Sequence, residues 1–246
     1  KPVDQDLEVI RGVLAEVERS GVRLMVGYNR RFDPDFMKAR ELVAAGQVGD
    51  IHILRITSRD PAPPPLSYIA VSGGLFLDMA IHDFDMARFI TGMEIVEVFA
   101  RGAVLVDEGI GQAGDIDTAT VTLTFSNGAL GVIDNSRKAA YGYDQRLEVF
   151  GSGGMIRVEN NRHHQYELYN QEGTHQALPL DFFMDRYAEA YANEMKAFVE
   201  AVRNGSDMPV TGEDGLLSIA VGLAAKKSLV ENRPVRIEEI LAVTLN

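Results

Sequence analysis

Apolar residues follow two kinds of spacing along the chain. In five stretches they recur every three or four positions, which is the spacing of a helix with one buried face. Asp33 and Pro34 have the residue types of an N-cap and a first helical position. Gly21 and Gly205 follow the ends of two other stretches, as C-terminal stop signals do. The spacing predicts helices within residues 3–20, 33–49, 73–89, 181–205 and 211–233.

Elsewhere apolar and polar residues alternate, as in a strand with one buried face. Short segments at 23–29 and 50–60 predict two strands, and the four prolines within 61–74 predict a loop. From residue 95 onward alternating segments are separated by short turns, which predicts an antiparallel meander. These strands are expected within residues 95–106, 117–127, 128–139, 145–151, 154–160 and 165–173. The order of elements predicts an α+β fold with an open, mainly antiparallel sheet covered on one face by helices.

Composition narrows the class of protein. The chain has 246 residues and no cysteine, which excludes a disulfide scaffold, a thiolate zinc site and a cysteine nucleophile. Its formal net charge is -12 without a basic block, so neither nucleic acid nor an anionic membrane is an expected partner. No apolar run approaches the roughly 20 residues of a membrane span, and no secretory pattern opens the sequence. We therefore expect a cytoplasmic protein.

A glycine motif, GIGQAG at residues 109–114, matches the spacing of a dinucleotide-binding loop. Such a loop binds pyrophosphate when a helix follows it, because the helix N-terminus supplies the amides. Here the alternating segment DIDTATVTLTF follows. We therefore interpret the motif as a connection between strands, and find no Rossmann fingerprint in the sequence.

The apolar segment 73–89 contains an unusual set of ionisable residues, Asp78, His82, Asp83 and Asp85. On a helix, Asp78 and His82 lie one turn apart, and Asp85 continues the same stripe. Asp83 points elsewhere. A carboxylate beside an imidazole orients it and raises its pKa, which gives a pair able to take a proton from a hydroxyl. Two alternatives stay open: solvated carboxylates beside a buried structural histidine, or a metal site formed by the stripe.

Four segments resemble the Gfo/Idh/MocA family of oxidoreductases in their order and spacing. They are KPVDQDL at 1–7, GYNRRFDPDF at 27–36, ITSRDPAPPPLSYIAVSGGLFLDMAIHDFDMARF at 56–89, and YGYDQRLEVFGSGGMI at 141–156. Within the family, the run from TSRDP through DMAIHDFDMARF is most similar to the bacterial myo-inositol 2-dehydrogenases. The individual motifs are short, so the resemblance is more specific for the family than for the substrate.

The resemblance implies an N-terminal Rossmann domain that binds NAD and a strand ending in Glu-Lys-Pro, followed by an α+β domain. Because the sequence opens at Lys1, it implies that most of the dinucleotide domain lies outside this chain. Residues 1–28 are then expected to be the closing helix and strand of that domain. Residues 29–246 are expected to be the substrate-binding and oligomerisation domain. The chain as given is expected to be inactive alone. NADP is also compatible, because the residue that reads the ribose 2′ position lies outside the chain.

The resemblance also implies roles for individual side chains. Lys1 matches a lysine that lies between nicotinamide and substrate, whereas without the resemblance it is simply a surface lysine. His82 matches the general base that takes the hydroxyl proton while hydride leaves for the nicotinamide. Asp78 matches a carboxylate that binds a substrate hydroxyl and supports the proton relay.

Three further residues are expected around the substrate. Arg30 is placed near cofactor and substrate, with a salt bridge across the interdomain surface as the alternative. Asp60 and Tyr143 are expected to line a polyol pocket, with the stabilisation of turns as the alternative. Arg186 and Tyr187 are weaker candidates, because an amphipathic helix accounts for them.

Together these expectations describe an oxidoreductase that transfers hydride from a secondary hydroxyl of a cyclic polyol, myo-inositol or a related sugar, to NAD. No metal is expected. A sugar-sensing protein of the same fold, which binds without turnover, is the alternative. The family covers the open sheet face by pairing subunits, so a homo-oligomer, a dimer or tetramer, is expected.

Overall fold

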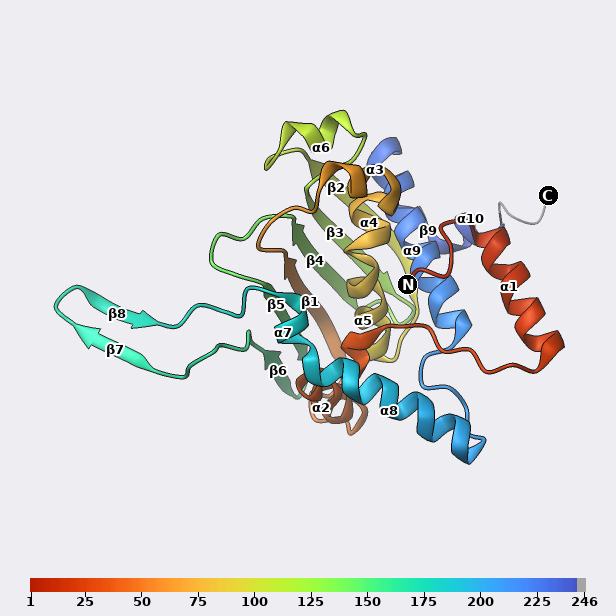
Figure 1. Cartoon of the computed structure of the whole chain (residues 1–246), viewed down its shortest axis with the longest axis horizontal. Helices are drawn as coiled ribbons and strands as arrows, with labels where there is room; N and C mark the ends of the chain where they lie inside the picture. Colours follow the sequence, from red (N-terminus) through yellow and green to blue (C-terminus); the bar gives the residue numbers. More distant parts are fainter. Residues whose placement is uncertain (243–246) are drawn as a thin grey trace.

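The structure is a computed structural model that describes residues 1–242. In these residues seven strands form one open sheet. They are β1 (Ile51–Arg59), β2 (Ile95–Ala103), β3 (Thr118–Phe125), β4 (Leu130–Ser136), β5 (Asp144–Gly151), β6 (Gly154–Val158) and β9 (Val235–Arg236). Across the sheet they follow the order β6-β5-β1-β4-β3-β2-β9. A separate hairpin of β7 (Glu167–Asn170) and β8 (Gly173–Gln176) projects away from the body of the molecule (Figure 1).

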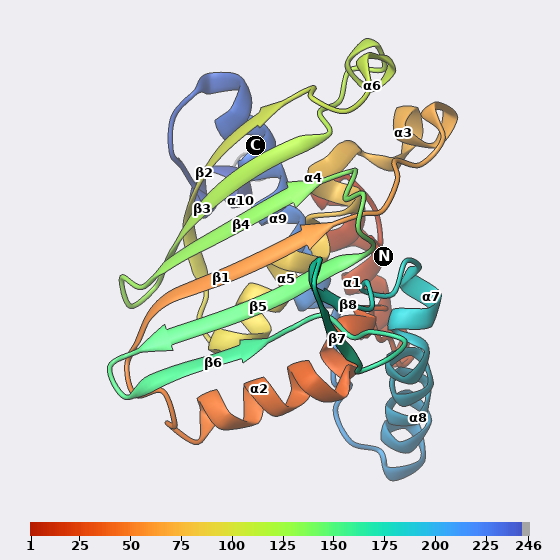
Figure 2. The same ribbon diagram turned by 90° about the vertical axis from the view of Figure 1, so that its left-hand side faces the viewer.

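Helices cover one face of this sheet and flank its ends. The helices of the described residues are α1 (Leu7–Ser20), η1 (Asn29–Phe32), α2 (Pro34–Ala44), α3 (Leu66–Ser72), α4 (Gly74–Asp78), α5 (Ile81–Thr91), α6 (Glu108–Gln112), α7 (Phe183–Arg186), α8 (Ala188–Asn204), α9 (Gly212–Glu231) and α10 (Ile237–Ala242). α4, α5 and α9 pack behind the strands, whereas the opposite face is free of helices (Figures 1 and 2). The predicted α+β fold is confirmed. No helix of the described residues is long and apolar enough to cross a membrane.

The alternation within the strands decides which face the helices cover. In β3 the buried residues are Ala119, Val121, Leu123 and Phe125, and the residues between them are threonines that are exposed or half-buried. Because successive side chains of a strand point to opposite faces, the apolar set packs against the helices as part of one core. The strand spacing read from the sequence is therefore confirmed for the central sheet.

The predicted meander is wrong in one respect that shapes the site. β1 lies between β5 and β4, antiparallel to β5 but parallel to β4. The register pairs Arg59 with Ser136, so the carboxyl ends of β1 and β4 meet at one edge of the sheet. In Figure 2 the arrowheads of both strands point toward the end at which the N-terminus, α4 and α7 lie. Alternation shows that a segment is a strand, but it does not specify its neighbour.

The single helix predicted within 73–89 is also wrong, because two helices meet at Met79 and Ala80. Gly73 and Gly74 both have positive φ, 89° and 78°, a backbone that favours glycine. The amides of Met79 and Ala80 both donate to the carbonyl of Leu75, so the regular helical ladder stops there. The regular helix is therefore interrupted between Asp78 and His82.

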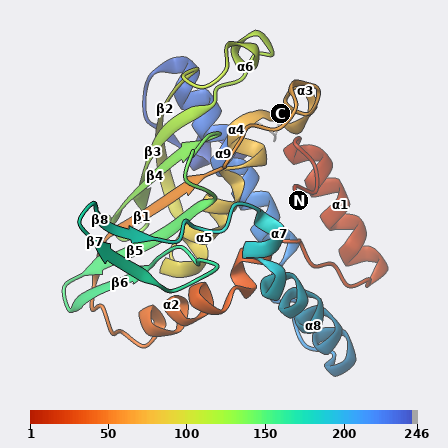
Figure 3. The same cartoon turned by 60° about the vertical axis from the view of Figure 1, so that its left-hand side comes forward.

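Other predicted elements need smaller corrections. The proline-rich loop holds the helix α3, because the prolines lie before Leu66 and leave 66–72 free to form turns. Residues 23–28 form no strand, and the amide of Val26 donates to the carbonyl of Val210 instead. The helix predicted at 181–205 is interrupted at Tyr187, between α7 and α8 (Figure 3).

The glycine motif lies in the connection between β2 and β3, as interpreted from the sequence. Part of that connection forms the short helix α6, with Asp107 as its N-cap. The strand β3 follows it, so the arrangement differs from a strand, glycine loop and long helix.

Candidate active site

A cavity of about 460 Å³ lies where the ends of β1 and β4 meet the helices. Its size falls within the range of about 300–1,000 Å³ that is usual for small-molecule sites. All six residues predicted from the sequence line it, namely Lys1, Arg30, Asp60, Asp78, His82 and Tyr143. The other lining residues are Asn29, Pro61, Ala62, Pro64, Tyr68, Met79, Arg137, Phe182, Phe183, Tyr187 and Tyr191.

Separate elements bring the predicted residues together. Asp78 ends α4 and His82 lies in the first turn of α5, so both face the cavity from the break between these helices. Asp60 follows β1, and Tyr143 precedes β5, which pairs with β1. Arg30 lies in the short helix η1. The sheet edge and the helix break therefore place side chains from distant segments around one cavity.

Asp78 has three polar partners. Its Oδ1 accepts a hydrogen bond of 2.8 Å from the hydroxyl of Tyr68, and its Oδ2 accepts one of 2.9 Å from Nη1 of Arg137. Its backbone carbonyl accepts from the ammonium group of Lys1. In the described part of the chain no hydrogen bond joins its carboxylate to His82. The two residues share the cavity but do not form the hydrogen-bonded pair that helical spacing would allow.

His82 is a neutral imidazole in this setting. Burial lowers its pKa well below 6.5, and the positive charges of Lys1 and Arg30 lower it further. Its Nδ1 is buried and has no hydrogen-bond partner among the described residues. The ring of Tyr28 meets it edge-on, with centroids 6.1 Å apart. The expectation that a neighbouring carboxylate raises the pKa of His82 is wrong, because burial and the charges of Lys1 and Arg30 all lower it.

Lys1 is exposed as a residue, yet its ammonium group enters the cavity and donates to Asp78. Burial lowers the pKa of this amine to about 8. The carboxylate of Asp78 opposes that shift, whereas Arg30 and Arg137 add to it. Lys1 can therefore exchange a proton near neutral pH.

Asp60 is a mostly buried carboxylate, with 24% of its side chain exposed. Burial raises its pKa to about 6, although the charges of Arg137 and Arg30 oppose the rise. Its Oδ2 lies 3.9 Å from Nη1 of Arg137. Its backbone also takes part in the local turn, since its carbonyl accepts from the amide of Ala139. The side chain faces the cavity while the backbone stabilises the turn.

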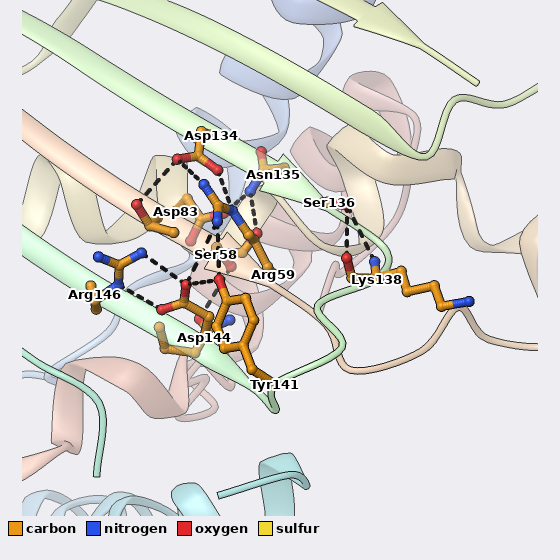
Figure 4. A network of polar contacts seen from close by, with 12 residues as sticks. Ser58, Arg59, Asp83, Asp134, Asn135, Ser136, Lys138, Tyr141, Asp144 and Arg146 are labelled. Carbon is orange, nitrogen blue, oxygen red and sulfur yellow. Dashed lines mark hydrogen bonds and ion pairs between the residues drawn. The ribbon is translucent and has the colours of Figure 1, made fainter. Parts of the chain in front are cut away.

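Arg30 is buried and paired with a buried aspartate of α5. Its Nη1 donates to Asp83 at 2.6 Å, and its Nη2 lies 3.4 Å from both Ser58 and the Tyr143 hydroxyl. Burial opposes its charge, but its neighbours raise its pKa overall. Asp83 also accepts from Asn135 at 2.8 Å, and Figure 4 shows these two residues and Ser58 close together. The salt bridge foreseen for Arg30 exists, but its partner is Asp83 and not a group across a domain surface.

Asp85 does not belong to the cavity. It is buried and bonded to Arg31, whose Nη2 lies 2.6 Å from Asp85 Oδ1 and 2.9 Å from Asp214. The stripe of Asp78, His82 and Asp85 is thus divided between a cavity and a separate ion-pair cluster. Among residues 1–242 no group of three or more His, Asp or Glu side chains could hold a metal ion. The metal alternative has no ligand set in this arrangement.

Several cavity residues were not predicted from the sequence. Arg137 follows β4, and Tyr68 lies in the helix α3 that the sequence did not predict. Tyr187, a weaker candidate, lines the cavity, whereas Arg186 beside it is bonded to Asp33 outside the cavity. The alternation of polar and apolar residues in the strands does not predict that Arg137 lines a cavity. Its position follows from the parallel pairing of β1 and β4, which brings it next to Asp60.

The cavity suits the reactive end of a nicotinamide cofactor better than its phosphates. Lys1 and the neutral imidazole of His82 place two groups that can exchange a proton at the cavity wall, as the transfer of a hydroxyl proton beside a nicotinamide requires. Among the described residues, the only glycine-rich segment with the phosphate-loop spacing is 109–114, and a strand follows its short helix. The residues present therefore fit the nicotinamide and the substrate, but they offer no pyrophosphate cradle.

Comparison with known proteins identifies the protein family to which the chain belongs. The family model for the GFO/IDH/MocA C-terminal domain matches residues 36–157. The chain belongs to the Gfo/Idh/MocA family of oxidoreductases, as the resemblance of the motifs implied.

Two relatives and one solved structure show which members of the family the chain is similar to. The chain is 54% identical over 241 residues to myo-inositol 2-dehydrogenase of Thermotoga maritima, covering 98% of this chain and 72% of the relative. It is 48% identical over 237 residues to inositol 2-dehydrogenase of Rhizobium meliloti, covering 96% and 72%. A crystal structure of scyllo-inositol dehydrogenase from Lactobacillus casei, with bound NAD(H) and scyllo-inositol, superimposes with a TM-score of 0.88. That structure is 32% identical and covers 97% of this chain and 72% of its own.

Proposed function

We propose that this chain forms the substrate side of an NAD-dependent dehydrogenase that oxidises a secondary hydroxyl of myo-inositol or a closely related cyclic polyol. The observation that carries the proposal is the convergence of Lys1, Asp78 and His82 on one cavity of suitable size. Similarity to inositol dehydrogenases over nearly the whole chain supports the substrate class.

His82 is proposed as the proton acceptor. Alcohol oxidation requires a base for the hydroxyl proton and an acceptor for the hydride, held in close alignment. The neutral imidazole is the form that can accept a proton, and its lowered pKa keeps it in that form near neutral pH. When bound, NAD supplies the hydride acceptor.

The other side chains are proposed to orient the ring. A polyol presents several hydroxyls, and each needs a partner that can donate or accept. Asp60 and Asp78 supply carboxylate acceptors, while Lys1, Arg30 and Tyr143 supply donors. Phe182 and Phe183 add apolar surface beside them. This mixture matches a ligand with polar edges and apolar ring faces.

The division into domains is part of the proposal. We propose that residues 29–246 are the substrate-binding and oligomerisation domain, and that residues 1–28 close a dinucleotide-binding domain. The absence of a pyrophosphate cradle among the described residues supports this division. Turnover then requires the rest of the dinucleotide-binding domain, so this chain alone should bind polyol without reducing NAD.

The helix-free face of the sheet is proposed as the surface between subunits. It carries a polar network in which Arg59 pairs with Asp134 at 2.7 Å and with the Tyr141 hydroxyl at 3.0 Å (Figure 4). Exposed apolar side chains lie on β4, β5 and β6 of the sheet, namely Leu130, Val132, Phe150 and Met155. A face of this kind fits a second copy of the chain. Light scattering should give a dimer or tetramer, and a monomer at micromolar concentration would contradict this.

The decisive experiment uses the polypeptide translated from its own start codon. NAD reduction is followed at saturating cofactor with myo-inositol, scyllo-inositol and a set of hexoses. We expect turnover with at least one inositol and a ketone product visible by NMR. Turnover confined to hexoses would refute the substrate class. Polyol binding without any NAD reduction would favour the sugar-sensing alternative.

A further inference from the structure

Arg137 is a buried cation that lies among the carboxylates of the cavity. It follows β4, and its side chain is 2% exposed. Nη1 donates to Asp78 at 2.9 Å and lies 3.9 Å from Asp60, while Nη2 lies 3.9 Å from Asp115. One guanidinium therefore faces three carboxylates that come from α4, from the end of β1 and from the turn after α6.

The hydrogen bonding of Arg137 is incomplete for a structural arginine. Its Nε and Nη2 are buried without a hydrogen-bond partner in the described chain. Burying a guanidinium whose donors are mostly unpaired is costly, whereas an arginine that only joins elements is usually bonded through several donors. Asp115 shows the contrast, because both its oxygens accept from the amide of Leu75 at the start of α4.

We propose that Arg137 is a positioning residue that fixes the carboxylate of Asp78 by its hydrogen bond and faces the carboxylate of Asp60 with its positive charge, so that both accept hydrogen bonds from neighbouring hydroxyls of the polyol at the cavity wall. The inference rests on the proposed function, because it assigns these two carboxylates to the same substrate. Arg137 acts through them and is not itself placed on the reacting atoms.

The geometry gives each carboxylate a different dependence on Arg137. Asp78 is held by a direct hydrogen bond, with Tyr68 on its other oxygen, so its orientation depends on the guanidinium fork. Oδ2 of Asp60 lies 3.9 Å from Nη1 of Arg137, so the interaction of Asp60 with Arg137 depends on the positive charge more than on the direction of the N–H groups. A lysine in place of Arg137 would keep the charge but lose the fork.

The charge on Asp60 also depends on its other neighbours. Burial raises its pKa to about 6, Arg137 and Arg30 oppose the rise, and Asp78 and Asp83 add to it. Tyr143 faces it from the start of β5, and Lys1 and His82 line the same cavity. In the wild type Asp60 is charged above about pH 6 and becomes neutral below it. Without Arg137, burial and the two aspartates act against Arg30 alone, so neutral Asp60 should persist to higher pH.

The test compares Arg137→Met, which keeps volume without charge, with Arg137→Lys. Arg236→Met is the matched control, since Arg236 is an exposed arginine on β9 bonded to Glu238 at 2.6 Å. The first readout is kcat/KM for the polyol between pH 5 and 9. In Arg137→Met we expect the acid limb to move up by about 1 unit or more, and activity at pH 7 to fall about 10-fold to 100-fold. Arg236→Met should match the wild type.

The second readout is independent of turnover. Aspartate labelled at the side-chain carboxyl carbon, assigned with Asp60→Asn, reports the titration of Asp60 by NMR in each variant. The midpoint should rise in Arg137→Met and stay near the wild type in Arg137→Lys. An unchanged midpoint in folded Arg137→Met, or a loss of activity in Arg137→Met that is uniform with pH, would show a merely structural role and overturn the inference.

Two failures remain distinguishable. If the wild type reduces no NAD with any polyol, the proposed function fails, and the Asp60 titration still decides the effect of Arg137 on the carboxylates. If Arg137→Met does not fold, Arg137→Lys decides alone. It should then show a wild-type Asp60 midpoint with reduced kcat/KM, because Asp78 has lost its oriented partner. Wild-type activity of Arg137→Lys at every pH would overturn the inference.

Discussion

Replacing Asp83 with alanine should destabilise the protein severely, because it leaves a buried charge unpaired. Asp83 is fully buried, and Arg30, its partner at 2.6 Å, is 6% exposed. Removing one member of a buried ion pair typically costs about 3–5 kcal/mol. Asn135, which donates to Asp83 at 2.8 Å, also loses its acceptor.

Two features place the expected cost at the lower end of that range. Arg30 lines the cavity, and its Nη2 keeps contacts of 3.4 Å with Ser58 and Tyr143. We therefore expect Asp83→Ala to lower the free energy of unfolding by about 3 kcal/mol. With an m value of about 3 kcal/mol per molar, the urea midpoint should fall by about 1 M.

Urea unfolding followed by circular dichroism measures this change. The matched control is Glu41→Ala, whose ion pair with Lys38 on α2 is exposed on both sides. That variant should lose about 1 kcal/mol or less. Equal and small losses in the two variants would refute the reasoning, because they would mean that Arg30 finds solvent or another partner when Asp83 is removed.

Two further predictions concern catalysis and pH. His82→Ala should lower kcat about 10²-fold to 10⁴-fold and weaken polyol binding less than 10-fold. The control His175→Ala, on the exposed hairpin, should change neither kcat nor binding. If His82→Ala keeps its kcat, His82 is not the base. Burial lowers the pKa of Lys1 to about 8, so between pH 8 and 10.5 the unfolded state binds more protons and stability should rise with pH. Thermal unfolding of Lys1→Met should lack this rise, whereas Lys38→Met at an exposed position on α2 should retain it. A slope unchanged by Lys1→Met would contradict the burial of its ammonium group.

The sequence predicts best what local pattern determines. The alternation in β3 and the cap formed by Asp33 predict an element from its own residues, and both are confirmed. Asp78 and His82 were expected together because they are four residues apart, and both line the cavity. The two residues do not lie on one continuous helix, however. The prediction that they share a site is therefore correct, but the continuous helix on which it relied does not form.

What the sequence does not reveal depends on contacts between distant segments. The pKa of His82 is lowered by its burial and by the charges of Lys1 and Arg30, and nothing local to residue 82 indicates either cation. Arg137 reaches Asp60 only because β1 inserts beside β4, a pairing that alternation cannot specify. The resemblance to a family predicted residues with known motifs, but it did not point to these supporting contacts.

Asp85 illustrates the limit of helical spacing as a guide to function. It lies three residues beyond His82 and was assigned to the same stripe, yet its carboxylate pairs with Arg31. Arg31, which lies on another helix, forms this buried ion pair with Asp85, and the sequence does not predict the pairing. Asp78 and His82 of this stripe therefore line the cavity, whereas Asp85 forms a structural ion pair.

A crystal structure of the protein with bound myo-inositol tests the central claim most directly. The account predicts the ring in the cavity of about 460 Å³, with one hydroxyl about 2.6–3.2 Å from a nitrogen of His82 and another at that distance from a carboxylate oxygen of Asp78. Inositol bound elsewhere, for example in the cavity between Tyr141 and His163 at the base of the hairpin, would contradict it.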